Sequence, residues 1–341
     1  MRKVVSIKDI ARIVGVSHST VSRALRASPV VNADTAGRIR KVAEQQGYRA
    51  SLIGRSLVMQ RSMTMGCVAT DIADPFVAEV VNGIEEVANR QGYAVFLASS
   101  HADPQKELDV VRSFHERRVD GVIVPASRVG SLYLPHLAEL RIPIVLVNNQ
   151  HPGSFTHSVS IDNVGAARRI TSHLLKLGHK RIAYIGNRGG SQANADRLHG
   201  YRIELCKARL PFRSDLVMHA DATPEGGRAV MQRLLARRWP TAVFCYDDLT
   251  ALGALAAAHT AGVSVPGDLS VVGFDDLFVS SYTAPPLTTL RQPMKEMGQR
   301  AAEILLALLR GEVAERKVKF QGMLIVREST APAGNPQSQL S

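Results

Sequence analysis

The sequence contains few of the residues that mark secreted or membrane-spanning proteins. Its 341 residues include three cysteines and one tryptophan, and aromatic residues make up 5% of the chain. It has no run of about 18 apolar residues, which is the length that a membrane-spanning helix requires. The opening residues MRKVVSIKDI lack the apolar stretch and the cleavage site of a secretion signal. We therefore expect a cytoplasmic protein that makes no contact with a membrane.

The cysteines give no sign of a disulfide or a metal centre. Cys67, Cys206 and Cys245 are far apart, and each lies in an apolar run. A zinc site uses cysteines at close, regular spacing, and an odd number of cysteines cannot form a complete set of disulfides. These positions predict buried, reduced thiols. The sequence predicts neither a metal nor a cofactor.

Acidic residues are scarce in the first fifth of the chain. The whole sequence carries 42 Lys+Arg against 30 Asp+Glu, a net charge of +12. Residues 1–61 hold 12 basic and 3 acidic side chains, a net charge of +9. The other 280 residues hold 30 basic and 27 acidic side chains, a net charge of +3. Because lysine and arginine bind phosphate groups, residues 1–61 are the first candidate for contact with a polyanion such as DNA.

Residues 6–25, SIKDIARIVGVSHSTVSRAL, predict two short helices joined by a tight turn. Ser6 and Asp9 form a capping pattern ahead of apolar residues at helical spacing. Gly15 ends the first helix, and Ser17 is placed to cap the second. Two short helices around a glycine-containing turn are typical of a helix-turn-helix.

A third helix begins after Asn32 and ends at Gly47, so that three helices can close a small core. The second helix presents short or hydrogen-bonding side chains near its N-terminal end, namely His18, Ser19, Ser22 and Arg23. That end of a recognition helix meets base edges in the major groove. Arginine can pair with guanine through two hydrogen bonds, whereas serine and histidine discriminate less between bases.

The strings IKDIARIVGVSHSTVSRAL and VVNADTAGRIRKVAEQQGY resemble the head of the LacI–GalR (lactose-repressor/galactose-repressor) family of bacterial transcription regulators. The resemblance extends to about residue 330. It implies a DNA-binding head over 1–48, a hinge over 49–61 and an effector-binding and dimerisation core over 62–330. The residues expected to contact DNA are Ser6, Ser17, His18, Ser19, Thr20, Ser22, Arg23 and Asn32 in the head, and Ser51, Arg55 and Leu57 in the hinge.

The resemblance also implies that the hinge forms a helix over 50–57 on the operator. In the family two such helices lie in the minor groove, and Leu57 matches the leucine that wedges into the central base step. Two positions depart from the family pattern, because Ala50-Ser51 replaces Pro-Asn and Gly54 replaces a helix-favouring alanine. Glycine costs about 1 kcal/mol relative to alanine inside a helix. We therefore expect a hinge helix that is disordered without DNA and marginal on it.

From residue 64 onward, apolar runs alternate with amphipathic segments. Such a pattern is typical of buried parallel strands connected by helices. The expected strands are 65–70, 93–99, 121–126 and 142–148 in a first sheet, and 181–187, 241–246 and 269–276 in a second; expected helices include 76–91 and 104–117. The predicted fold is a small all-α helix-turn-helix head plus a two-lobed α/β periplasmic-binding-protein-like core with parallel sheets.

The family resemblance implies that the chain crosses between the lobes three times, near residues 162, 290 and 320. The first lobe then covers about 62–162 and 291–320, and the second covers about 163–290 and 321–330. The last residues, 331–341, are rich in proline and polar side chains. This composition predicts a disordered tail.

Ligands of parallel sheets gather at the carboxyl ends of the strands, which face the cleft between two such lobes. Polar residues at those ends match the family's effector positions, and the expected contacts are Asp74, Phe76, Asn148, Arg197, Asp247, Asp275 and Gln292. The family frequently has aspartate at the position of Asn148, and some sugar binders have an aromatic near Ala222. Asp248 is interpreted instead as the cap of a helix over 249–259.

These features predict a repressor that binds a palindromic operator as a homodimer and is switched by a small polar metabolite, such as a sugar or a sugar acid. Two alternatives use the same α/β core: a solute-binding protein and a sugar-active enzyme. Neither accounts for residues 1–61. The sequence also lacks the G-x-S-x-G and HExxH motifs of common hydrolases. We therefore expect a regulator rather than an enzyme.

Overall fold

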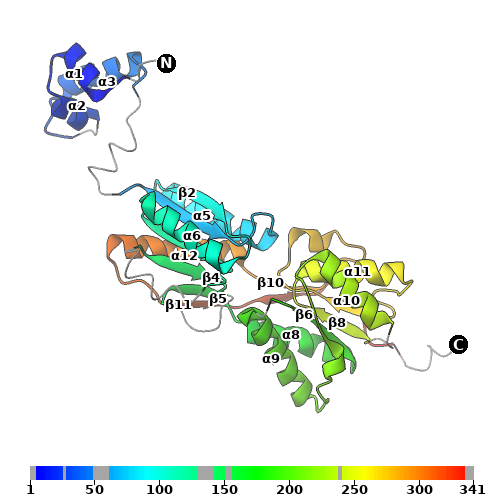
Figure 1. Ribbon diagram of the computed structural model, residues 1–341. Coiled ribbons are helices and arrows are strands. Elements are labelled where there is room, and N and C mark those ends of the chain that lie inside the picture. Colours follow the sequence, from blue (N-terminus) through cyan, green and yellow to red (C-terminus); the bar gives the residue numbers. More distant parts are fainter. Residues whose placement is uncertain are drawn as a thin grey trace. The chain divides into compact units, whose positions relative to one another are not determined.

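The computed structural model describes residues 5–25, 28–48, 61–129, 142–149, 156–189, 191–236 and 240–334. The chain divides into two compact units, Met1–Ser62 and Met63–Ser341 (Figure 1). Ser51, Arg55 and Leu57, and with them the predicted hinge helix, lie outside the described residues.

The first unit contains three helices, α1 (Ile7–Val14), α2 (His18–Leu25) and α3 (Ala33–Gln45). They pack around a small apolar core formed by Ile10, Ala11, Val14, Val21, Ala24, Ala36, Ile39 and Ala43. α1 ends at Gly15, which has a φ of 75° and lies in the left-handed region that favours glycine. The predicted helix-turn-helix is therefore present, with its apolar residues facing inward.

The second unit contains a six-stranded parallel sheet with the strand order β11-β5-β4-β3-β1-β2. Its strands are β1 (Thr64–Ala69), β2 (Ala94–Ser99), β3 (Gly121–Pro125), β4 (Ile144–Val147), β5 (Ser158–Ile161) and β11 (Lys317–Phe320). Helices α5 (Pro75–Arg90) and α12 (Met294–Arg310) lie side by side and pack on one face through Cys67 and Ile123 (Figure 1). Helix α6 (Pro104–Glu116) covers the other face, to which Val68 and Val122 point.

A four-stranded parallel sheet has the order β7-β6-β8-β9. Its strands are β6 (Ile182–Asn187), β7 (Val217–Ala220), β8 (Ala242–Cys245) and β9 (Ser270–Val272). Helices α8 (Asn163–Lys176) and α9 (Gln192–Lys207) cover one face, and α10 (Pro224–Leu235) and α11 (Asp248–Thr260) cover the other. We call the six-stranded sheet with its helices the first lobe, and the four-stranded sheet with its helices the second lobe.

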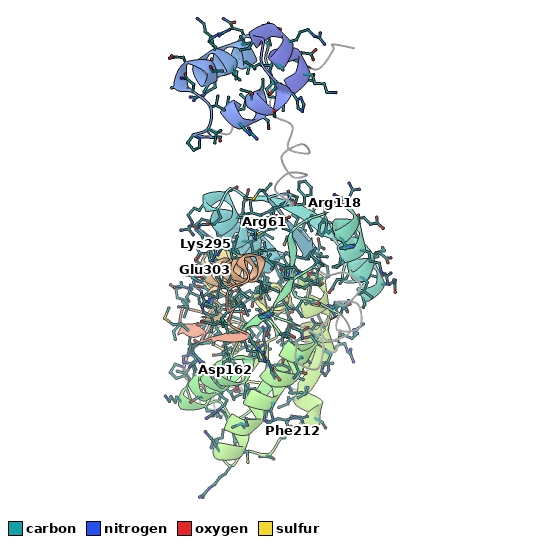
Figure 2. All side chains as sticks on the ribbon, turned by 90° about the vertical axis from the view of Figure 1, so that its left-hand side faces the viewer. Arg61, Arg118, Asp162, Phe212, Lys295 and Glu303 are labelled. Atoms are coloured by element: carbon teal, nitrogen blue, oxygen red, sulfur yellow. The ribbon has the colours of Figure 1, made fainter. Side chains whose placement is uncertain are left out.

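The two lobes are connected by three passages of the chain. The first passage is at Asp162, between β5 and α8. The other two involve a small antiparallel sheet of β10 (Thr289–Arg291) and β12 (Met323–Ile325). In Figure 2, Asp162 lies between Lys295 of the first lobe and Phe212 of the second. The passages bring the strand ends of both lobes to one cavity.

The predicted parallel strands and the two predicted helices are all present, with ends shifted by up to four residues. Five strands were not predicted, namely β5, β7, β10, β11 and β12. The expectation that all three cysteines are buried is wrong for Cys206, which is exposed on α9. Among the described residues, no helix is long and apolar enough to cross a bilayer, and no group of three acidic, histidine or cysteine side chains could hold a metal.

The predicted disorder of 331–341 is wrong for its first residues. The amide of Ala331 donates to Ser270 Oγ at 3.1 Å, and its carbonyl accepts from His179 Nε2 at 3.0 Å. The amide of Ala333 donates to the carbonyl of Leu177 at 2.8 Å. A segment without regular structure is thus fixed by hydrogen bonds to the second lobe, which composition does not reveal. Residues 335–341 lie outside the described part of the chain.

Candidate functional site

The second helix of the helix-turn-helix presents a polar face to solvent. Val21 and Ala24 are buried against α1 and α3, whereas His18, Ser19 and Arg23 are exposed. Ser22 and Thr20 are half-buried beside them. Positions 18 and 22, and positions 19 and 23, are four residues apart, or about one helical turn. These four side chains therefore share one surface of α2. Hydrogen-bonding groups at the start of a helix can read base edges in a major groove.

Three of the predicted DNA-contacting residues cap the helices of the head. Ser6 forms a capping box with Asp9, since its side chain accepts from the Asp9 amide at 3.3 Å while the Asp9 carboxylate accepts from the Ser6 amide at 3.0 Å. Ser17 Oγ accepts from the amide of Thr20 at 3.1 Å, and Asn32 Oδ1 accepts from the amide of Asp34 at 2.9 Å. These caps fix the starts of the helices. All three residues are exposed to solvent.

All three helices of the first unit carry exposed basic side chains. The described residues of the first unit include exposed Lys8, Arg12, Arg23, Arg38, Arg40 and Lys41. Of these, Arg12 lies 3.7 Å from Asp9, and Arg38 Nη2 donates to the carbonyl of Val14 at 3.3 Å. A surface with this charge attracts DNA from any sequence through its phosphates. Arg23 is the basic residue on the predicted recognition helix itself.

In the second unit, all seven predicted effector residues line one cavity of about 320 Å³. They come from the carboxyl ends of strands in both lobes, from α9 and from the segment that follows β10. The residues are Asp74, Phe76, Asn148, Arg197, Asp247, Asp275 and Gln292, and the lining also includes Arg128, Asn187, Ala222, Thr223 and Tyr246. The topology therefore brings together the side chains that sequence placed at separate strand ends.

Arg197 of α9 is buried at the centre of this cavity, with 3% of its surface exposed. Its guanidinium carbon lies 3.5 Å above the ring centre of Phe274 and 4.4 Å from that of Tyr246. Arg197 Nε donates to Asn163 Oδ1 at 2.9 Å, and Nη1 donates to the carbonyl of Tyr246. Stacking and hydrogen bonds from two sides fix the plane of the guanidinium. A fixed cation of this kind can orient hydroxyl or carboxylate oxygens of a ligand.

A chain of hydrogen bonds connects the two lobes on the floor of the cavity. Asn148 Nδ2 donates to Gln292 Oε1 at 3.1 Å, and Gln292 Nε2 donates to Asp275 Oδ1. Burial raises the pKa of Asp275 well above its usual range, although the nearby Arg197 guanidinium opposes this shift. Asn148 and Asp275 have φ values of 48° and 120°. Their positive φ values indicate a backbone held in place by its surroundings.

Asp74 and Phe76 form the wall supplied by the first lobe. Asp74 caps α5, since its Oδ1 accepts from the amide of Phe76 at 2.9 Å. Burial raises the pKa of Asp74 to about 6, with the nearby Asp247 adding to the shift. Phe76 is 8% exposed and lines the cavity with its ring. An aromatic edge or face beside carboxylates can hold the apolar face of a sugar.

The role predicted for Asp248 needs correction, because the residue that caps α11 is Asp247. Asp247 is the cap of α11, because its Oδ1 accepts from the amide of Thr250 at 2.7 Å, and it also lines the cavity. Asp248 is the first residue of the helix and is fully buried. Its carboxylate accepts from the Leu277 amide at 2.8 Å and from the Ser280 and Thr289 hydroxyls at 2.6 Å each. Asp248 therefore fastens the segments that follow β9 to the start of α11.

The polar residues of the lining that were not predicted include Arg128 and Asn187. Arg128 follows β3, and Asn187 is the last residue of β6. The rule that located the other residues, polar side chains at the carboxyl ends of parallel strands, applies equally to these two. Arg128 was overlooked because it comes two residues after the end of the predicted strand, in the turn over 126–128.

Two family models match the chain. Residues 6–51 match the model described as bacterial regulatory proteins, lacI family, and residues 171–330 match the periplasmic binding protein-like domain. These ranges cover the helix-turn-helix and most of the second lobe.

Individual proteins match along nearly the whole chain. The HTH-type transcriptional regulator DegA of Bacillus subtilis is 33% identical over 331 residues, which cover 96% of this chain and 98% of DegA. A structure of the transcriptional regulator CelR in complex with cellobiose is 30% identical, with a TM-score of 0.73, and covers 95% of this chain and 99% of that one. A structure of the lac repressor dimer bound to operator and the anti-inducer ONPF has a TM-score of 0.89 at 24% identity, covering 96% of this chain and 100% of that one.

Proposed function

The chain belongs to the LacI family of bacterial regulatory proteins. On that premise we propose that it is a cytoplasmic repressor that binds its operator as a homodimer. Binding of a sugar or sugar acid would lower or raise its affinity for the operator. The family consists of DNA-binding transcriptional regulators and not of enzymes. The single observation that carries the proposal is the presence in one chain of an exposed polar helix face and a cavity lined by both lobes.

The DNA-binding part of the proposal assigns sequence reading to α2. His18, Ser19, Ser22 and Arg23 would meet base edges, and Arg23 would discriminate most because its guanidinium can pair with guanine through two hydrogen bonds. One head of this size reads only a half-site. Two heads on a symmetric dimer would therefore recognise a near-palindrome. The lac repressor dimer bound to operator is an example of this arrangement in a protein of the same fold.

The ligand-binding part assigns the cavity to a small polyhydroxylated molecule. Arg197 would donate to ligand oxygens, whereas Asp247 and Asp275 would accept hydrogen bonds from hydroxyl groups. Phe76 would lie against the apolar face of a sugar ring. CelR, which is similar in structure and sequence, was solved with cellobiose.

Binding at the cavity would change the DNA affinity through the lobes. The cavity is lined from both lobes, and the Asn148–Gln292–Asp275 chain of hydrogen bonds crosses between them. A ligand that binds more tightly to one arrangement of the lobes shifts the population toward that arrangement. If that arrangement also favours or opposes operator binding, ligand and DNA affinities must be coupled by the same factor in both directions.

The proposal is tested by selecting DNA sites with the full-length protein and then measuring affinity for the selected site at several salt concentrations. We expect a near-palindromic site whose binding weakens steeply with salt, with a slope of about −0.9 per phosphate contact. A panel of sugars and sugar acids is then added to the complex. Equal affinity for selected and scrambled DNA, or a selected site unaffected by every ligand that binds the protein, would contradict the proposal.

A further inference from the structure

We propose that the ligand of the cavity is a polyhydroxylated carboxylate and that Arg128 binds its carboxylate group. This inference rests on the function proposed above, because it names the chemical class of ligand that the same cavity takes. Three features carry it: the fixed backbone of Arg128, the lack of a carboxylate partner for its guanidinium and the position of Arg128 relative to the two carboxylates of the second lobe.

The backbone of Arg128 is held by a carboxylate that has no solvent exposure. Glu107 of α6 is 0% exposed, and its Oε2 accepts from the amide of Arg128 at 2.9 Å. Its Oε1 accepts from the hydroxyl of Ser127 at 2.5 Å. A buried carboxylate is costly to desolvate unless hydrogen bonds compensate for the lost water. Here that carboxylate fixes the turn after β3 and so determines where the arginine side chain begins.

The guanidinium of Arg128 lines the cavity and has no acidic partner in the described part of the chain. Its Nη1 donates to the carbonyl of Gly189 in the second lobe at 3.4 Å. A Cβ atom at position 189 would lie 2.9 Å from that nitrogen, so glycine leaves room for the guanidinium. Arginine has five N–H donors, and this one long contact leaves the others available to a ligand.

The two acidic residues that the second lobe contributes to the cavity lie toward one edge of its sheet. The strand order is β7-β6-β8-β9. Asn187 ends β6 and Gly189 follows it, whereas Asp247 follows β8 and Asp275 follows β9, the edge strand. Arg128 meets the β6 side through Gly189, whereas Arg197 stacks over Tyr246 and Phe274 on the β8–β9 side. The two carboxylates that the second lobe contributes are thus grouped with Arg197. The first lobe adds Asp71 and Asp74, which follow β1.

A ligand that matches both sides has hydroxyl groups at one end and an anion at the other. The hydroxyl groups donate to Asp247 and Asp275, which accept hydrogen bonds when ionised. The planar fork of Arg128 fits a carboxylate through two parallel hydrogen bonds. Asn187 also lines the cavity, its Oδ1 accepts from the amide of Gly189 at 2.8 Å, and its side-chain amide has neutral N–H donors. A single guanidinium neutralises one negative charge, so a carboxylate suits this side better than a phosphate dianion.

The test measures binding of matched ligands to the full-length protein by calorimetry at constant ionic strength. The pairs are D-glucuronate with D-glucose, D-galacturonate with D-galactose and D-gluconate with D-glucitol, and D-glucose 6-phosphate is added as a phosphate. We expect at least one carboxylate to bind about 10- to 100-fold more tightly than its neutral partner, as charge-assisted hydrogen bonds do. In Arg128→Gln this preference is expected to disappear while binding of the neutral partner changes less than about 3-fold.

Two further variants separate a direct contact from other effects. Arg128→Lys keeps the charge but loses the fork, so it should recover only part of the preference. Arg188→Gln removes an arginine from the neighbouring loop, where it lies 3.9 Å from Asp221 and does not line the cavity. This control should keep the full preference for the carboxylate.

The inference is overturned if no carboxylate of the panel binds, if neutral sugars or the phosphate bind as tightly as the carboxylates, or if Arg128→Gln weakens both members of a pair equally. The last result would make Arg128 a contact between lobes rather than a ligand contact. A neutral sugar that alters operator affinity and binds at least as tightly as every carboxylate of the panel would remove this inference and leave the proposed function standing. A carboxylate that binds through Arg128 without altering operator affinity would support this inference and contradict the proposed function.

Discussion

The exposed face of α2 and the cavity of the second unit are built from the same kinds of polar side chain but are held in opposite ways. In the head, the hydrogen bonds of Ser6, Ser17 and Asn32 join residues two or three positions apart. In the cavity, Arg197 is bonded to Asn163, which lies 34 positions away, and Asn148 is bonded to Gln292, which lies 144 positions away.

The side chains of the head are thus displayed on a helix, whereas those of the cavity are held in place by bonds to distant parts of the chain. The recognition side chains of the head project from a helix whose stability depends on a separate apolar core, so they can be exchanged without unfolding it. The side chains of the cavity are part of the packing of the second unit. We therefore expect substitutions in the head to change DNA affinity, and substitutions in the cavity to change ligand binding and stability together.

The largest effect is expected for Arg197→Ala. The substitution leaves the Tyr246 carbonyl and Asn163 without their buried donor and Asp275 without its nearby cation. Removing one partner from a buried charged network costs about 3–5 kcal/mol. Denaturant unfolding followed by circular dichroism should show this loss in the second unit, together with loss of ligand binding. Arg188→Ala, at an exposed site, should change stability by less than about 0.5 kcal/mol. Equal stability of the two variants would show that the network is not structural.

The next effect is a pH dependence of the second unit that centres on Asp248. Burial raises the pKa of Asp248 to about 7 from an ordinary value of 3.8. Between these values the folded unit keeps the proton and the unfolded chain releases it, so the free energy of unfolding falls as the pH rises from about 4 to 7. The loss is roughly 2–4 kcal/mol, at about 1.4 kcal/mol for each pKa unit.

The variant Asp248→Asn sharpens this prediction, because an amide imitates the protonated acid. It can accept from the Leu277 amide and the Ser280 hydroxyl and donate to the Thr289 hydroxyl. Unfolding measured from pH 4 to pH 8 should be flatter for this variant than for the parent protein. The matched control is Asp109→Asn, whose carboxylate is 58% exposed, and it should leave the slope unchanged. A parent protein that gains stability over this pH range would refute the assignment.

A smaller effect, confined to DNA, is expected for Arg23→Ala. The side chain is exposed, and its loss should leave the thermal stability of the head unchanged. Affinity for the selected site should fall about 10- to 100-fold, and discrimination at one base pair should relax. Fluorescence anisotropy with single-base variants of the site measures both effects. Arg112→Ala removes an exposed arginine from α6 and serves as the charge-matched control. A uniform loss on every sequence would identify Arg23 as a phosphate contact instead.

The smallest effect is expected for Ser17→Ala. Ser17 Oγ caps α2 by accepting from the amide of Thr20 at 3.1 Å. Loss of such a cap costs about 1 kcal/mol, which should appear in the unfolding of the head and not in that of the second unit. Ser17→Asp retains a capping oxygen and should restore the stability. If both variants unfold like the parent protein, local caps do not stabilise the head.

The sequence predicted the helices of the head in more detail than the strands that surround the cavity. The head was predicted residue by residue because its caps, glycine and apolar spacing are all local features of the chain. The ends of long buried strands were equally visible as apolar runs. Strands β5 and β11 were not, because SVSI and KVKF are short, alternate with polar residues and pair with strands that are distant in the sequence or were themselves not predicted.

The cap of α11, predicted at Asp248 and found at Asp247, shows what local patterns cannot decide. Either aspartate could begin a helix by sequence alone. The carboxylate of Asp248 accepts hydrogen bonds from residues 277, 280 and 289 in the interior. The N-cap of α11 is therefore the preceding residue, Asp247. Arg128 was missed for a related reason, since its position depends on Glu107, which lies 21 residues earlier in the chain.

The central claim is that the cavity and the DNA-binding face are coupled, and one measurement tests it directly. The affinity of the tightest ligand found in the sugar and sugar-acid panel is measured by calorimetry with the full-length protein, alone and with saturating operator DNA. We predict that the two affinities differ by at least about 5-fold, and that the ligand changes the operator affinity by the same factor. Identical ligand affinities in the presence and absence of operator would contradict the claim.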